Sequence, residues 1–354
     1  KNHVGGECSE KGSQRFCFWN MADTSEGIPF KPRSLKQFKR HVKKLNDKSQ
    51  FDEEFMTIEK HFEFDKFSPT FFSSRLRVNV RKNRYTDVLP FEHSRVHLPE
   101  YPGISGSDYI NANYIDGDES LPDSKKWYVA AQGPLSSTVV DFWRMVWNEQ
   151  STMIVMLTKL FEKNSVKCDK YWPEKGSKEV GDLFVISAYS ELLLDTEELV
   201  LTKLRINHLP TGATRDILHL QYREWPDHGI PKSTEKFRLM LDLVDYFDNP
   251  SVPIIVHCSA GIGRTGTFCT VHNNLAKMKY FHYQSDVELD KLMLFDVMGT
   301  VGKLRKDRVK MVQAKEQYKF CYFAILEGAT QFRRMLKEKK GTPEYNDPDI
   351  FLPL

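Results

Sequence analysis

The chain has 354 residues, of which 40% are hydrophobic and 28% are charged, and its formal net charge is +3. This composition is typical of a globular protein and excludes a collagen-like, coiled-coil or wholly disordered chain. The balanced charge argues against nucleic-acid binding, and no apolar run approaches the roughly 18 residues of a membrane span. The six cysteines show no paired spacing, so we expect reduced thiols in an intracellular α/β protein, without disulfides or a zinc site.

The first 60 residues divide into two parts of different character. Residues 1–28 are rich in Gly, Ser, Glu and Lys and poor in aliphatic side chains, which predicts a flexible lead-in. The chain starts at Lys1 without a methionine, so we expect it to be a piece of a longer protein. Residues 29–60 are predicted to form an N-terminal helical extension.

A basic amphipathic helix is predicted within residues 31–48. Lysines and arginines dominate this segment, and its apolar residues are spaced three or four apart, as on one face of a helix. These residues are Leu35, Phe38, Val42 and Leu45. Such a helix either contacts an anionic membrane surface or a protein partner, or packs on the flank of its own domain; we favour the second alternative. A second amphipathic stretch follows at residues 51–64.

Residues 61–328 are predicted to form the main domain, in which short strand-like runs are interspersed with helical patterns. Expected strands cover residues 128–131, 153–158, 183–188, 199–206, 217–222 and 254–257. Expected helices cover residues 138–148, 234–247, 267–280 and 313–326. Because strands and helices do not alternate strictly, we predict a single α/β domain with a highly twisted mixed β-sheet flanked by helices. Residues 329–354 are charged and contain proline, which predicts a C-terminal tail.

One loop has the composition of an anion-binding catalytic site. The apolar run Ile254–His257 leads into small residues at 258–263, and a helical pattern follows, so backbone N–H groups and a helix N-terminus can surround an anion. Those dipoles would stabilise the thiolate of Cys258 as a nucleophile. Arg264 is placed to bind two phosphate oxygens at the mouth of the loop. The hydroxyl of Thr265 can donate to the sulfur and ease its departure in a second step.

The string CSAGIGRTG at residues 258–266 resembles the active-site signature of the protein tyrosine phosphatases. About thirty residues upstream, the string WPDHG at 225–229 resembles the general-acid loop of that family. The resemblance implies that Asp227 protonates the departing tyrosyl oxygen and then accepts a proton from the attacking water. Trp225 and Pro226 would support this loop as its anchor and hinge. Taken alone, an Asp between Pro and Gly is more often only a turn residue.

The resemblance extends over roughly residues 60–328 and implies a substrate pocket. The string KNRYTD at 82–87 is similar to the phosphotyrosine-recognition loop, in which Tyr85 would stack on the substrate ring and Asp87 would bind its backbone. A ring at the rim deepens the pocket, so a phosphoserine would not reach the nucleophile. Gln313 would place the hydrolytic water. The implied substrate-binding residues are Tyr85, Asp87, Ser259, Ala260, Gly261, Ile262, Gly263, Arg264, Gln313 and Gln317.

Three further residues are implied to support the site. His257 is expected to be buried and to hold the loop backbone through hydrogen bonds. By position in the resembling segment, Glu162 would orient Arg264 and Lys167 would meet the general-acid loop. The chain also departs from the family pattern, and these departures affect substrate selectivity rather than the chemical groups. They are Ala131 and Ala314 in place of Thr, His272-Asn273 in place of Ile-Asp, the unusual residues 284–307, and Lys310 in place of a small rim residue.

Three alternatives compete with a phosphotyrosine phosphatase. A catalytically silent phosphotyrosine-binding module would usually lack one of Cys258, Arg264, Asp227 or Tyr85, all of which are present. A cysteine protease would need a histidine base, and the side chain of His257 would point away from that of Cys258 on a strand. A metal-dependent phosphatase would need a spaced cluster of His and Asp, which the sequence does not show.

The expected function is therefore hydrolysis of phosphotyrosine in proteins through a phosphocysteine intermediate, with no cofactor or metal. The expected partners are phosphotyrosine-containing proteins and no nucleic acid, with a membrane or protein contact through residues 31–48 as an option. We expect a cytoplasmic location, either free or as the intracellular part of a membrane receptor.

Overall fold

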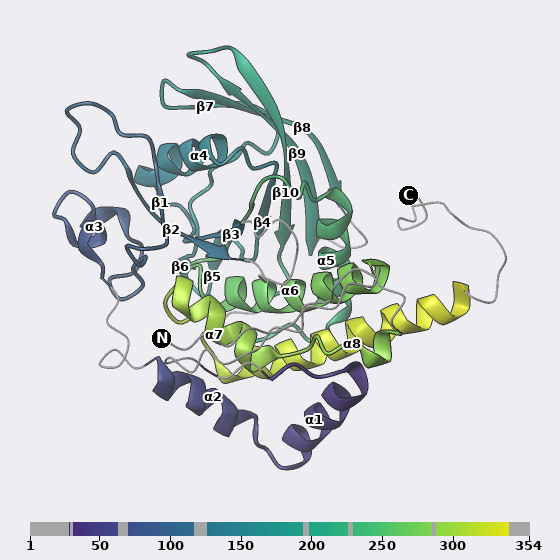
Figure 1. Ribbon diagram of the computed structural model, residues 1–354. Coiled ribbons are helices and arrows are strands. Elements are labelled where there is room, and N and C mark those ends of the chain that lie inside the picture. Colours follow the sequence, from purple (N-terminus) through teal and green to yellow (C-terminus); the bar gives the residue numbers. More distant parts are fainter. Residues whose placement is uncertain are drawn as a thin grey trace, which may run out of the picture.

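The computed structural model describes residues 28, 31–62, 70–116, 126–193, 198–225, 229–284 and 288–339. The strands are β1 (Arg95–His97), β2 (Tyr109–Asp116), β3 (Lys126–Ala131), β4 (Met153–Met156), β5 (Phe161–Glu162), β6 (Ser165–Val166), β7 (Gly176–Val180), β8 (Phe184–Leu193), β9 (Leu199–His208), β10 (Ala213–Tyr222) and β11 (Ile254–His257). Among these residues, nine strands form one mixed sheet in the order β1-β2-β3-β11-β4-β10-β9-β8-β7 (Figure 1). The α/β class predicted from the sequence is confirmed.

The helices lie on both faces of this sheet. They are α1 (Leu35–Asp47), α2 (Phe51–His61), α3 (Phe72–Arg75), α4 (Val139–Asn148), α5 (Glu235–Phe247), α6 (Gly263–Gln284), α7 (Val297–Asp307) and α8 (Lys315–Lys339), with short 3-10 turns η1 (Val80–Lys82), η2 (Ser136–Thr138) and η3 (Leu289–Lys291). α4 covers one face, and α5, α6 and α8 cover the other (Figure 1). The pleat of β11 divides its side chains between the two cores: Ile255 packs with α4, and Ile254 and Val256 pack with the other helices.

Four neighbouring strands at the centre of the sheet run parallel. β11 pairs in parallel with β3 on one side and with β4 on the other, and β4 pairs in parallel with β10. Their carboxyl ends therefore meet at one edge, where ligands bind in open α/β sheets. The segments that leave this edge begin at Gln132, Leu157, Arg223 and Cys258. Sheet topology thus brings together sequence motifs that lie up to 126 residues apart.

The C-terminal boundary predicted from the sequence is wrong in part. α8 continues to Lys339, so residues 329–339 belong to this helix and not to a tail. Ala329 and Phe332 are buried and extend the apolar face of the helix, while the charged residues that suggested a tail lie beside them. Residues 1–27 and 340–354, where the lead-in and the rest of the tail were predicted, lie outside the described residues. None of the helices within the described ranges is long and apolar enough to cross a membrane.

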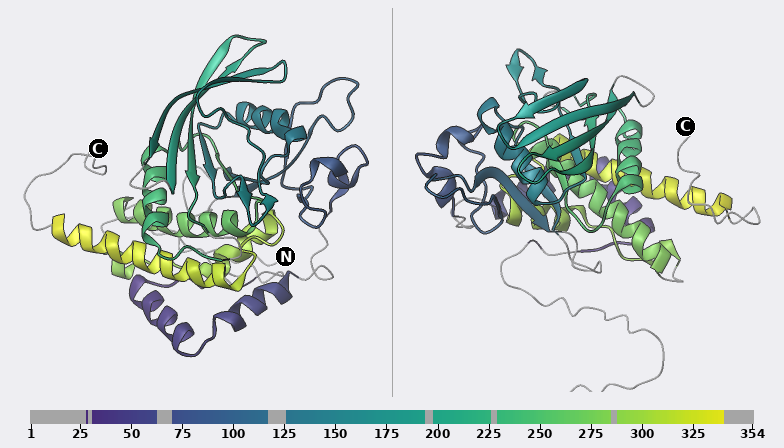
Figure 2. Two further views of the ribbon diagram at one scale, coloured as in Figure 1. Left: turned by 180° about the vertical axis from the view of Figure 1, so that it is seen from behind. Right: turned by 90° about the horizontal axis from the view of Figure 1, so that it is seen from above.

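The basic helix packs on its own domain, as we favoured. Figures 1 and 2 show α1 and α2 along the outer side of α8, away from the sheet. The four predicted apolar residues of α1 are buried, and Phe38 stacks between Phe295 and Tyr322 with ring centroids 5.2 and 5.6 Å apart. Ser34 caps the helix by accepting a hydrogen bond from the backbone of Gln37. The N-terminal extension is therefore part of the hydrophobic core.

Phe38→Ala is expected to lower the free energy of unfolding by about 3 kcal/mol, because it removes a fully buried ring and leaves a cavity beneath α1. Urea denaturation followed by circular dichroism measures the change. Lys39→Ala, at an exposed position of the same helix, serves as the control and should shift the midpoint little. Equal midpoints for both variants would show that α1 does not stabilise the domain.

Candidate active site

Cys258 lies at the base of a loop between β11 and α6. Its thiol is buried, and its sulfur accepts a hydrogen bond from the backbone N–H of Gly261 at 3.2 Å. The helix that begins at Gly263 directs its N-terminus toward the same loop. The predicted sequence of strand, loop and helix is therefore present, and α6 begins four residues earlier than expected from the sequence.

The backbone carbonyls of five consecutive residues, 258–262, are all held by donors. The donors to these carbonyls, in order, are His257 Nδ1, Gly133 N, Arg308 Nη2, Arg308 Nε, and both Val312 N and Gly266 N. In a trans peptide the carbonyl of one residue points opposite to the N–H of the next. Holding the carbonyls outward therefore turns the following N–H groups into the loop, where they can bind an anion.

Arg308 is the residue of this loop support that sequence analysis missed. It is fully buried, and besides the carbonyls of Ala260 and Gly261 it donates to the side-chain oxygens of Asn111 and Asn113 at 2.8 and 2.6 Å. Burial lowers the pKa of Arg308 to about 10, so it remains charged at neutral pH. The sequence carries no local signal for this role, because the contacts join segments almost 200 residues apart.

Gly261 is required by both conformation and space. Its φ of +72° lies in the left-handed region, and a Cβ atom there would lie 2.1 Å from the carbonyl oxygen of Ala131. At the start of α6, a Cβ on Gly266 would lie 2.3 Å from the backbone nitrogen of Val312. The loop is thus packed directly on the neighbouring backbone of β3 and of the segment before α8.

Arg264 and Glu162 form a bidentate ion pair, with both nitrogen–oxygen distances at 2.7 Å. Both side chains are buried, and Arg264 also donates to the carbonyl of Leu157. Burial acts to raise the pKa of Glu162, but hydrogen bonds and charge from Arg264 outweigh it and hold that pKa below its usual value. The contact holds the guanidinium of Arg264 against the carboxylate of Glu162, the two residues that the resemblance had paired.

Tyr85 is joined to the Cys258 loop by a relay of hydroxyl groups. Ser259 Oγ donates to the carbonyl of Lys167 at 2.8 Å, so the hydroxyl of Tyr85, 2.8 Å away, donates to Ser259. Arg84 fastens the same segment by donating to the carbonyls of Gly133 and Pro134. Arg84 is a second supporting residue that sequence analysis missed, although it lies within the quoted KNRYTD motif.

The predicted residues at the rim are less enclosed. Asp87 is exposed, and its carboxylate lies 3.5 Å from the ammonium group of Lys310. Gln313 is exposed, and Gln317 lies against Gly263, where a Cβ would be 2.9 Å from its side-chain oxygen. The structure therefore brings Tyr85, Gln313 and Gln317 to the Cys258 loop, with Asp87 at the outer edge.

Two predictions from the sequence remain to be compared with the structure: the hydrogen bond from Thr265 to the sulfur of Cys258, and the loop that carries Asp227. Thr265 is buried in the first turn of α6, but its hydroxyl has no hydrogen-bond partner within the described part of the chain, so the bond to the sulfur is not formed here. Pro226 and Asp227 lie outside the described residues, and so does the predicted meeting of Lys167 with their loop. Trp225 is described: its ring is buried against Phe237, and its N–H donates to the carbonyl of Gly229.

His257 is a structural residue and cannot act as the base for Cys258. Its Nδ1 donates to the carbonyl of Cys258, and its Nε2 accepts from the hydroxyl of Tyr171 at 2.7 Å. Because that hydroxyl has one proton, His219 Nε2, 2.8 Å away, must donate to Tyr171. Both ring nitrogens of His257 are thus occupied away from the sulfur, so this histidine cannot serve as the base that a cysteine protease would need.

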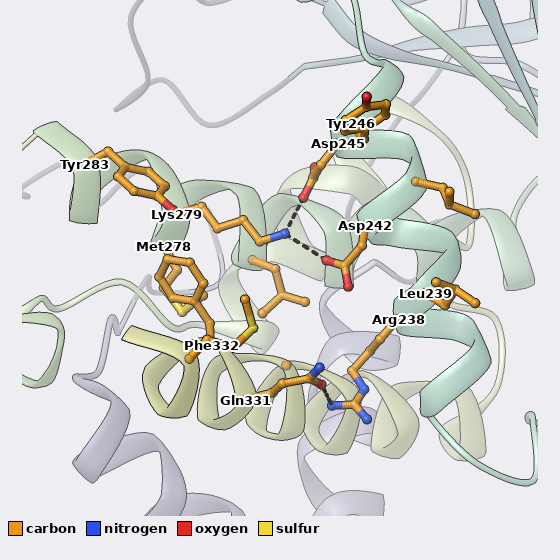
Figure 3. Close-up of a pocket in the computed structure, with 14 residues that line it drawn as sticks. Arg238, Leu239, Asp242, Asp245, Tyr246, Met278, Lys279, Tyr283, Gln331 and Phe332 are labelled. Carbon is orange, nitrogen blue, oxygen red and sulfur yellow. Dashed lines mark hydrogen bonds and ion pairs between the residues drawn. The ribbon is translucent and has the colours of Figure 1, made fainter. Parts of the chain in front are cut away.

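A cavity of about 370 Å³ lies between α5, α6 and α8 (Figure 3). Lys279 on α6 forms ion pairs there with Asp242 and Asp245 of α5. Burial alone would raise the pKa of Asp245, but His272 and Lys279 lower it to about 2. None of the predicted site residues lines this cavity, so it is separate from the Cys258 loop.

Within the described ranges, no cluster of His, Cys, Asp and Glu could hold a metal ion.

Comparison with known sequences identifies the family. A family model described as protein-tyrosine phosphatase matches residues 79–327, which is more than half of the chain. The chain belongs to the protein-tyrosine phosphatase family. It is 40% identical over 306 residues to tyrosine-protein phosphatase Lar of Drosophila melanogaster, and 40% identical over 292 residues to receptor-type tyrosine-protein phosphatase F of Homo sapiens.

These alignments cover 85% and 81% of this chain but 14% of each relative. The chain therefore spans less than a fifth of the length of these relatives. α1 and α2 precede the part of the chain that the family model matches.

Lowering the pH from about 6.5 to 4 is expected to destabilise this domain through its buried histidines. Burial lowers the pKa of His257 to about 4 and that of His219 to about 3, against about 6.5 when exposed. The unfolded chain therefore binds more protons in this window, and each histidine removes up to about 3 kcal/mol from the free energy of unfolding by pH 4.

Urea denaturation at several pH values, for wild type and His219→Gln, isolates one of these contributions. Gln can still donate to Tyr171 but does not titrate, so the variant should lose less stability than wild type between pH 6.5 and 4. All other titrating groups are common to both proteins. Parallel pH curves would contradict a neutral His219.

Proposed function

We propose that this chain hydrolyses phosphotyrosine in proteins through a phosphocysteine intermediate. The observation that carries the proposal is the loop at Cys258, in which five carbonyls are held outward and an N–H is directed at the sulfur. Such a loop fits the oxygens of a phosphoryl group around the thiolate. Membership of the tyrosine phosphatase family supports the same chemistry.

The first step is attack of the Cys258 thiolate on phosphorus. A sulfur–phosphorus bond forms while the phosphorus–oxygen bond to tyrosine breaks, and Asp227 gives its proton to the departing oxygen. The loop N–H groups and the guanidinium of Arg264, held by Glu162, stabilise the charge on the three remaining phosphoryl oxygens. In this mechanism Thr265 turns its buried hydroxyl to the sulfur in the second step.

The second step is hydrolysis of the phosphocysteine. Gln313 positions a water molecule, Asp227 accepts a proton from it, and the new phosphorus–oxygen bond displaces the thiolate as inorganic phosphate forms. Every group required is a side chain or backbone amide of this chain, so the mechanism uses no metal or cofactor. In this proposal Lys167 contacts the loop that carries Pro226 and Asp227.

Tyr85 provides the selectivity for tyrosine in this proposal. Its ring at the rim of the loop, fixed through Ser259, makes the pocket deep enough for an aryl phosphate and too deep for phosphoserine. Asp87 binds the substrate backbone, and Gln317 lines the pocket. The proposed partners are phosphotyrosine-containing proteins in the cytoplasm, where kinases supply them.

The alternative of a silent phosphotyrosine-binding module shares this pocket but not the turnover. This alternative is disfavoured because the chain has the residues that would react and also the residues that hold them in place. Glu162 holds Arg264 by two hydrogen bonds, and His257 and Arg308 hold the loop that surrounds Cys258.

Turnover of matched phosphotyrosine and phosphoserine peptides, without added metal, tests the proposal. Wild type should release phosphate from the phosphotyrosine peptide alone. Cys258→Ser should abolish turnover because it removes the thiolate, and Asp227→Ala should lower kcat by about 10²–10⁴-fold through loss of the general acid. Tight binding of the phosphotyrosine peptide by wild type without phosphate release would instead establish the binding module.

A further inference from the structure

The segment that carries Gln313 has a strained backbone. Lys310 and Val312, which connect α7 to α8, have φ values of +53° and +58°. The left-handed region is sterically unfavourable for an L-residue, and a β-branched residue such as Val312 is rare in it. Such a conformation persists only where the surrounding structure imposes it.

The side chain of Arg305 holds the strained backbone of this segment from one side. This α7 side chain is 2% exposed, and it donates from Nε to the carbonyl of Met311 and from Nη2 to that of Val312, both at 3.0 Å. On the other side, the N–H of Val312 donates to the carbonyl of Ile262 in the catalytic loop at 3.1 Å. The two residues before Gln313 are therefore held between a buried guanidinium and the loop of Cys258.

The N-terminal extension in turn holds Arg305. Glu59 on α2 forms an ion pair with Arg305, with 2.5 Å between Oε1 and Nη2. One turn earlier, the ring centroid of Phe55 lies 5.5 Å from the guanidinium carbon of Arg305. Burial lowers the pKa of Arg305, and a buried cation that loses its counter-ion is strongly destabilised. The side chain of Glu59 is 47% exposed, so the ion pair connects the surface of α2 with the buried guanidinium of Arg305.

We propose that Glu59 is a positioning residue for the hydrolytic step: through Arg305 it fixes the backbone that presents Gln313 to the attacking water. The inference rests on the proposed function, since it requires Gln313 to act in the second step. Neither Glu59 nor Arg305 contacts Cys258, Glu162 or Arg264 in the interactions described above. Loss of the ion pair therefore slows hydrolysis of the phosphocysteine more than its formation.

Rapid mixing of Glu59→Gln with an aryl phosphate separates the two steps. The expected result is a burst of the phenol approaching one equivalent per enzyme, followed by steady turnover about tenfold slower than that of wild type. Arg305→Lys keeps the charge but loses the planar fork that donates from Nε and Nη2 to the two carbonyls, so it should give the same burst.

Glu54→Gln is the matched control on the same helix. Glu54 accepts hydrogen bonds from Tyr318 and Tyr322 of α8 at 2.9 and 2.6 Å and has no described contact with the segment 310–313. This variant should lower Tm by loosening α2 while the kinetics remain those of wild type, without a new burst.

Four outcomes would contradict the inference. If Glu59→Gln and Arg305→Lys turn over like wild type, or slow both steps equally without a burst, then Arg305 is only structural. If Glu54→Gln shows the same burst, then docking of α2 as a whole, and not Glu59, positions Gln313. A wild type that hydrolyses no phosphotyrosine would overturn the proposed function and this inference together.

Discussion

The outward hold on five consecutive carbonyls around Cys258 is the constraint on which the rest of the site depends. Carbonyl oxygens turned into this loop would repel a thiolate and a phosphoryl group, whereas the opposite orientation leaves only N–H groups facing them. Arg308 supplies two of the holding bonds, and the end of β11, the turn after β3, the first turn of α6 and the segment before α8 supply the others. The loop is therefore shaped by its surroundings and not by its own sequence alone.

Three buried arginines surround this loop, and each is compensated differently. Arg264 has the paired carboxylate of Glu162, and Arg305 has the half-exposed carboxylate of Glu59. Arg308 is fully buried, and its described hydrogen bonds go to neutral oxygens. Burying a cation of this kind lowers the free energy of unfolding unless its N–H donors are all hydrogen-bonded. Here the buried positive charge lies beside a loop whose N–H groups can bind an anion.

The same supports join parts of the chain that are far apart in sequence. The hydroxyl relay from Tyr85 through Ser259 to Lys167 links the segment of Tyr85, the Cys258 loop and the segment after β4. The hydrogen bonds from Tyr171 to His257, and from His257 to the carbonyl of Cys258, approach the loop from the face of the sheet that α4 covers. The Cys258 loop thus lies where several rigid elements meet, an arrangement that can hold functional groups in a fixed geometry.

The sequence by itself predicted the α/β class, the strand at 254–257 and the residues of the Cys258 loop. These features are local: β-branched runs form strands, and small residues before a helix form an anion-binding loop. The extent of α8 was missed because the charged residues of 329–339 hid the buried Ala329 and Phe332. Only the tertiary structure decided the roles of Arg305, Arg308 and Tyr171. Their partners lie on other elements, and no pattern within a single segment records which distant backbone groups a buried side chain will hold.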